Sequence, residues 1–173
     1  SKLWTSGVEE KQKMLSEMMD YVDICFGNAR DAAKCLGYSE AGIDFINGDY
    51  SICVDEEHMR NVLNHYHFSH LITTLRNSIS ASDNGWSGAV CTPDDYYKGR
   101  DYMLHIVDRV GGGDSFASGF LHGILSDMGS RKSLEFGLAS AAIKHTIPGD
   151  LNYINESEVL AMVESDGAGR VQR

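Results

Sequence analysis

The chain has 173 residues, of which 42% are hydrophobic, and this is enough for one compact domain with an apolar core. Its formal net charge of −10 argues against a surface that binds nucleic acid or an anionic membrane. No apolar run approaches the roughly 20 residues that a membrane-spanning helix needs, and the four cysteines form no C-x-x-C pair. We therefore expect a cytoplasmic protein with reduced thiols and with neither a nucleic-acid nor a membrane partner.

Helices and short strands alternate in the first half of the sequence. Apolar residues recur at helical spacing from Val8 to Met19, and the acidic start of residues 55–65 suits a helix N-terminus. A helix that opens at Asn28 should stop at Gly37. Short apolar runs predict strands at 21–28, 70–75 and 87–91, an irregular excursion is expected at 42–53, and Ser82–Gly85 is predicted to be a turn.

The second half of the sequence continues the alternation. Residues 96–107 predict two strand segments joined around Lys98–Arg100. Three consecutive glycines then precede a helix that runs to about Ser126, and further helices are expected at 133–145 and 156–163. Helices that alternate with short apolar strands indicate a layered α/β fold.

The glycine turn, defined as Gly111–Asp114, lies within residues 108–120 (DRVGGGDSFASGF) and carries most of the predicted chemistry. Three glycines permit positive φ and let a ligand approach the backbone without meeting a Cβ. At a helix start, unpaired N–H groups and the dipole favour an anion. Asp114 is placed there to accept a proton from an attacking hydroxyl. From the residues alone, a flexible loop followed by an Asp N-cap is an alternative, since the turn lacks a P-loop lysine and a G-x-G-x-x-G pattern.

The string at 108–120 resembles the D-T-x-G-A-G-D-x-F-x-x-G signature of ribokinase-like (phosphofructokinase B type) carbohydrate kinases. This resemblance implies a three-layer αβα fold, with residues 1–173 as its C-terminal, nucleotide- and phosphate-binding part. It implies Asp114 as the catalytic base, and the amides of Gly111, Gly112, Gly113 and Asp114 as the groups that contact the transferred phosphate. Arg109 stands for the usual Thr and Gly112 for the usual Ala, and both departures also occur among 2-keto-3-deoxygluconate kinases.

Other segments resemble the family in the same order along the chain. Asn28 and Asp31 occupy the place of its N-x-x-E motif, which organises Mg²⁺ and phosphates, with Asp31 for the usual Glu. Thr74 and Arg76 fall where a strand end contacts the nucleotide phosphates, and Arg76 could pair with phosphate oxygens.

The Ala-rich segment from Leu138 to Thr146 resembles the family's helix that closes over the adenine. Within it the resemblance nominates Leu138, Ala142 and His145 as ATP-binding residues. The loop that follows contains Asp150, which the resemblance to 2-keto-3-deoxygluconate kinases nominates as a contact to the sugar acid.

The resemblance thus implies an ATP- and Mg²⁺-dependent kinase acting on a hydroxyl of a sugar or sugar acid, with 2-keto-3-deoxygluconate as the favoured substrate. Family members are longer, and their sugar-binding part and lid would precede Ser1. We therefore expect self-association, or association with a missing N-terminal half that covers apolar strand edges. Two alternatives remain open: a catalytically silent nucleotide-binding or structural fragment, and a nucleoside kinase of the same fold.

Overall fold

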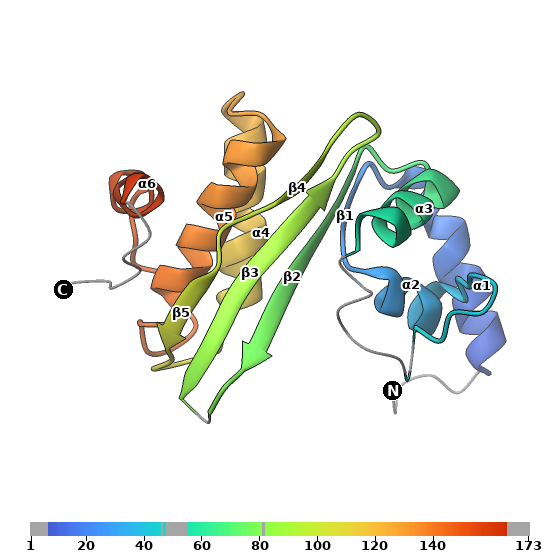
Figure 1. The fold of residues 1–173 in the computed structure, drawn as a ribbon, viewed down its shortest axis with the longest axis horizontal. Coiled ribbons are helices and arrows are strands. Elements are labelled where there is room, and N and C mark those ends of the chain that lie inside the picture. The colour runs from blue at the N-terminus through green and yellow to red at the C-terminus, as the bar shows by residue number, and fades with distance from the viewer. Residues whose placement is uncertain (1–6, 46, 48–54, 81, 166–173) are drawn as a thin grey trace. The chain divides into compact units, whose positions relative to one another are not determined.

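The computed structural model describes residues 7–45, 47, 55–80 and 82–165 (Figure 1), so most of the predicted excursion at 42–53 lies outside the described part. The chain divides into two compact units, Ser1–Thr73 with Cys91–Tyr96 and Thr74–Val90 with Tyr97–Arg173. Each unit is described by itself. No helix in the described ranges combines the length and the apolar character that a membrane crossing requires.

The first unit consists of short helices around a parallel strand pair. Its helices pack over a core that includes Met59, Leu63 and Phe68, each at most 2% exposed. Strand β1 pairs in parallel with the start of β2, with Ile24 opposite His70. The elements are α1 (Val8–Met18), the 3-10 turn η1 (Met19–Tyr21), β1 (Ile24–Phe26), α2 (Ala29–Leu36), α3 (Glu56–Tyr66) and the first residues of β2 (His70–Ser78).

Helix α2 begins and ends at the residues that the sequence indicated. The side-chain oxygen of Asn28 accepts a hydrogen bond from the Asp31 amide at 3.0 Å and caps the first turn. Gly37 ends the helix in the left-handed region at φ 74°. The predicted helix is therefore confirmed, because both ends are specified by local chemistry.

The second unit contains most of the sheet and the longest helices. The strand order is β1-β2-β3-β4, and β5 pairs antiparallel with β3, so that Trp86 lies opposite Tyr102. The predicted pair of strands within 96–107 is confirmed. The elements are β3 (Asp83–Cys91), β4 (Tyr96–Lys98), β5 (Tyr102–His105), α4 (Gly112–Leu125), α5 (Ser130–Lys144) and α6 (Glu156–Glu164), with β2, β3 and β4 each contributing residues to both units.

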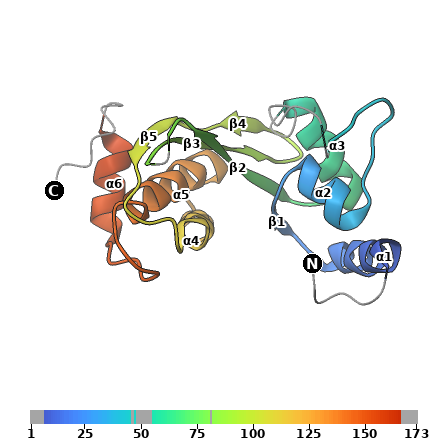
Figure 2. The same ribbon diagram turned by 90° about the horizontal axis from the view of Figure 1, so that it is seen from below.

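Helices α4 and α5 lie side by side against one face of β3 and β5 (Figure 2). Small residues allow this, because a Cβ on Gly119 would lie 3.0 Å from the Cα of Gly137. The indole of Trp86 on β3 contacts the rings of Phe116 and His145, with centroids 6.1 and 5.3 Å away. The predicted α/β class is confirmed, and this packing fixes the start of α4 against the end of α5.

The prediction of a turn at Ser82–Gly85 is wrong. Strand β3 already begins at Asp83, and Asn84 pairs with Leu104 of β5. The chain reverses earlier, where the amides of Ile79 and Ser80 donate to the carbonyl of Asp83 at 3.1 and 3.0 Å. Pairing with a strand distant in sequence outweighs the local turn preference of the Asp-Asn-Gly triplet.

Candidate active site

The glycine turn forms the cap and first turn of α4, in a conformation that requires glycine at its first position. Gly111 has φ 75°, in the left-handed region, and its carbonyl accepts the Ser115 amide at 2.9 Å. A Cβ at Gly111 would lie 2.6 Å from the carbonyl oxygen of Asp150. Both the backbone conformation and the close approach of the 147–150 loop therefore exclude a larger residue.

The next two glycines face different surroundings. A Cβ on Gly112 would lie 2.7 Å from the His145 ring, whereas a Cβ on Gly113 would meet nothing within 4 Å. The amides of Gly113 and Asp114 belong to the first turn of α4, where N–H groups have no intrahelical acceptor. Open space beside such amides, at the positive end of a helix dipole, suits an anionic group such as phosphate.

Asp114 projects from the same first turn and is exposed to solvent. Its backbone carbonyl accepts a hydrogen bond from the Ser118 hydroxyl at 2.8 Å. Within the described part of the chain, no hydrogen bond or ion pair engages its carboxylate. The carboxylate is thus accessible to a hydroxyl that approaches the phosphate-binding amides.

Asp108 links the glycine turn to the 147–150 loop. One carboxylate oxygen accepts the Val110 amide at 3.0 Å and the other accepts the Gly149 amide at 2.8 Å. These backbone hydrogen bonds lower the pKa of Asp108 below its ordinary value. The structure thereby brings Asp150, a residue predicted from the sequence, against Gly111 of the turn.

Basic residues gather beside the turn in a chain whose net charge is −10. Burial lowers the pKa of His145, and the positive charges of Arg76, Lys144 and Arg109 lower it further, although its bond to the Ala141 carbonyl opposes them. All three charges therefore act on one ring that lies against Gly112 at the start of α4. A local positive field of this kind favours binding of a polyphosphate.

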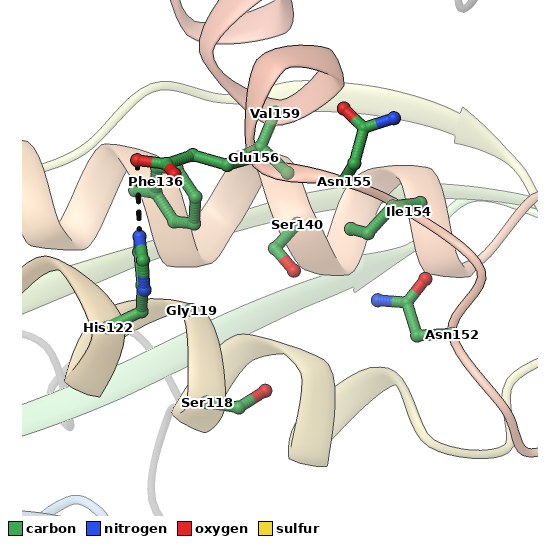
Figure 3. A pocket seen from close by; sticks show the side chains of 10 residues that line it. All are labelled: Ser118, Gly119, His122, Phe136, Ser140, Asn152, Ile154, Asn155, Glu156 and Val159. Carbon is green, nitrogen blue, oxygen red and sulfur yellow. Dashed lines mark ion pairs between the residues drawn. The ribbon is translucent and has the colours of Figure 1, made fainter.

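A cavity of about 330 Å³ lies between α4, α5 and α6, and Figure 3 shows its lining. At one end of it, Asn152 donates from Nδ2 to the Ser115 hydroxyl at 2.7 Å, and Ser115 is bonded in turn to Ser140 at 2.8 Å. At the other, His122 and Glu156 are 3.4 Å apart. The cavity includes none of the site residues predicted from the sequence, and its polar bonds anchor the segment that follows Asp150 to the two helices.

The sequence pattern of pfkB family carbohydrate kinases matches residues 2–156, which is most of the chain and includes the whole glycine turn. The chain belongs to this family. The glycine turn therefore lies within the matched region, and it coincides with the glycines and the aspartate of the family signature that residues 108–120 resemble.

Three similar proteins show how much of a family member the chain represents. It is 36% identical over 73 residues to the 5-dehydro-2-deoxygluconokinase of Halalkalibacterium halodurans, covering 40% of this chain and 22% of that protein. It is 35% identical over 73 residues to the 2-dehydro-3-deoxygalactonokinase of Haloferax volcanii, covering 42% and 23%. The crystal structure of a 2-dehydro-3-deoxygluconokinase from Thermotoga maritima matches with TM-score 0.78 and 38% identity, over 94% of this chain and 46% of that one. Each match spans less than half of the other protein.

The residues nominated for ATP binding in this pfkB family chain differ in exposure: two reach solvent and three are buried. Thr74 is half-buried and Arg76 exposed on β2. Leu138, Ala142 and His145 are at most 2% exposed, within or directly after α5. Their burial favours a packing role over direct contact with a nucleotide: His145 lies against Gly112 of the turn, whereas Leu138 lies against Gly99. Their assignment as ligands stays a prediction.

The two residues nominated for metal binding belong to the first unit, and the glycine turn belongs to the second. Asn28 is 6% exposed and its side-chain oxygen is engaged by the Asp31 amide, whereas Asp31 itself is exposed. Among the described residues, no three His, Cys, Asp or Glu side chains gather as metal ligands would. Mg²⁺ commonly takes one or two carboxylates together with substrate phosphates, which the single exposed carboxylate of Asp31 fits.

Sequence reasoning missed Asp108 and Lys144 as parts of the site. Asp108 lies within the signature string, but only its bond to Gly149, 41 residues away, reveals its role. Lys144 was detectable as a charged residue in an apolar, Ala-rich helix, where a lysine needs buried partners.

Proposed function

We propose that the intact protein transfers the γ-phosphoryl group of ATP to a hydroxyl of a sugar acid, with Asp114 as the general base. The observation that supports this most strongly is the juxtaposition in one helix turn of exposed Asp114 with Gly113, whose missing side chain leaves open space beside helix-terminal amides. Membership of the pfkB family of carbohydrate kinases supports the reaction class.

The chain's own residues supply positioning and charge in this reaction. The amides of Gly113 and Asp114 stabilise negative charge on the phosphoryl oxygens, and Arg76 and Arg109 add positive potential nearby. Asp114 accepts the hydroxyl proton as the hydroxyl oxygen attacks phosphorus. When bound, ATP supplies the phosphoryl group and Mg²⁺ neutralises its phosphates, for which Asp31 and Asn28 are the nominated residues.

We further propose that the substrate is a deoxy keto sugar acid, with 2-keto-3-deoxygluconate first among the candidates. The named activities of the three similar proteins share this chemical class, although they differ in the sugar. Asp150, which lies against Gly111, is the nominated contact to the substrate. A carboxylate there would serve as a hydrogen-bond acceptor for substrate hydroxyls.

The proposed base is tested by Asp114→Asn in the full-length gene product, with Asp101→Asn as a matched exposed control. We expect kcat to fall by about 100- to 10,000-fold in the first variant, with unchanged nucleotide affinity, and no change in the second. Turnover close to that of the unsubstituted enzyme in Asp114→Asn would exclude Asp114 as the base.

The proposed substrate class is tested by a phosphorylation screen of the same protein. The screen compares 2-keto-3-deoxygluconate, 2-keto-3-deoxygalactonate and 5-keto-2-deoxygluconate with ribose, fructose and adenosine. We expect the highest kcat/KM among the three acids. A preference for adenosine would favour a nucleoside kinase, and no phosphorylation of any compound would favour a catalytically silent protein.

A further inference from the structure

Lys144, the last residue of α5, is fully buried, with 0% exposure. Its Nζ donates to the carbonyl of Ile147 at 3.1 Å and to the carbonyl of Gly149 at 2.7 Å. Among the described residues, no carboxylate lies within ion-pair distance of this ammonium. Lysine is almost never fully buried unless its charge is compensated. Here the two main-chain carbonyls accept its hydrogen bonds, and the Asp108 carboxylate, whose pKa Lys144 lowers, adds a longer-range attraction.

Lys144 lies directly against the glycine turn. Its Cε would lie 3.3 Å from a Cβ on Gly111, so the side chain packs beneath the residue that starts the turn. Gly149 is hydrogen-bonded through both of its backbone polar groups, since its amide donates to Asp108 and its carbonyl accepts from Lys144. The 147–150 loop is therefore held between the carboxylate of Asp108, which follows β5, and the ammonium of Lys144, which ends α5.

Burial raises the cost of losing either the Lys144 ammonium or its two carbonyl partners. Removing a buried charge's partners, or the charge itself, leaves polar atoms without the hydrogen bonds that offset their burial. Without Lys144, the carbonyls of Ile147 and Gly149 would lose their donor, and Asp150 would lose the loop geometry that sets it against Gly111.

We propose that Lys144 is a positioning residue for phosphoryl transfer: its ammonium acts as a built-in cation that fixes the 147–150 loop against the glycine turn. Lys144 touches neither reactant in this role. It acts through Asp150 and through the conformation of Gly111. The proposal rests on the proposed kinase function, because its catalytic consequence is read as turnover, but its structural consequence can be measured without activity.

The first test is Lys144→Ala in the full-length gene product, with Lys132→Ala on the exposed face of α5 as the control. We expect kcat to fall on the order of 100-fold, as for a misplacement of about 1 Å at a reacting centre, with a smaller change in the KM for ATP. Ammonium chloride should restore part of the lost kcat, because NH₄⁺ can donate to both orphaned carbonyls. Tetramethylammonium at equal ionic strength, which cannot donate, should not.

A second readout separates this proposal from the proposed function. In Lys144→Ala, ammonium should raise the melting temperature and restore hydrogen-exchange protection of the Gly149 amide, whether or not the protein phosphorylates a sugar acid. If these effects appear while Asp114→Asn keeps full turnover, the base assignment fails and the role of Lys144 stands.

Three results would overturn the role of Lys144. The first is unchanged kcat in Lys144→Ala. The second is loss of kcat that ammonium and tetramethylammonium restore equally, because this would be a salt effect. The third is failure of both Lys144→Ala and Lys144→Gln to fold with or without ammonium, which would assign Lys144 to global stability rather than to positioning.

Discussion

The imidazole of His145 occupies the space that a side chain on Gly112 would need: a Cβ there would lie 2.7 Å from Cε1 and 2.9 Å from Nε2. The ring is held in place because its Nδ1 bonds the Ala141 carbonyl at 2.6 Å and because it packs on Trp86. Gly112 stands where the family signature usually has Ala. The His145 ring leaves no room for the methyl group of an alanine, so glycine fits at position 112 in this chain.

Gly112→Ala should destabilise the protein by about 1–3 kcal/mol, the usual cost of overpacking a core. Urea denaturation of the full-length protein measures this free energy. Combining it with His145→Ala should cost less than the sum of the two single changes, because the smaller residue at 145 leaves room for the new methyl group. Strictly additive free energies would show that the two positions do not interact.

Gly113→Ala, by contrast, should leave stability unchanged or raise it by about 0.4–1 kcal/mol, since its Cβ would meet no protein atom within 4 Å. Its turnover should fall by on the order of 100-fold, because the methyl group would occupy the space from which a phosphate reaches the amides. Comparing melting temperature with kcat in this variant and in Gly112→Ala separates the two roles. Full activity in Gly113→Ala would place the phosphate elsewhere.

The stability of the protein should fall as the pH drops below about 6.5. Burial lowers the pKa of His145 in the folded state below its ordinary value of about 6.5. Between these two pKa values the unfolded chain binds more protons than the folded one, so acid favours unfolding. Urea denaturation from pH 8 to 5 measures the slope, which His145→Gln should reduce because glutamine does not titrate. Equal slopes in both proteins would contradict the prediction.

Asn28 can be tested for a role beyond capping α2. Asn28→Ala should cost about 1 kcal/mol through loss of the bond to the Asp31 amide, whereas Asn28→Ser keeps a capping oxygen and should retain most of the stability. If Asn28 also serves Mg²⁺ or phosphate, both variants should require more Mg²⁺ for half-maximal turnover. Normal Mg²⁺ dependence in Asn28→Ser would restrict Asn28 to the helix cap.

Much of the fold was predictable where local chemistry decides it. The ends of α2 follow from Asn28 and Gly37, and the start of α4 follows from Gly111. The turn predicted at Ser82–Gly85 was misplaced, because β3 gains hydrogen bonds with β5 that local preference does not include. The start of α5 was predicted three residues late, because Gly129 rather than a side-chain cap precedes it.

The sequence by itself determined that an aspartate follows three glycines at a helix start, and that this turn suits a phosphate. Only the tertiary structure decided what each glycine meets: Asp150 at Gly111, His145 at Gly112 and open space at Gly113. It also decided that Lys144 points inward to two carbonyls. The reason is physical: a turn's conformation depends on neighbouring residues, whereas the partners of a buried charge come from whichever segments the fold packs around it.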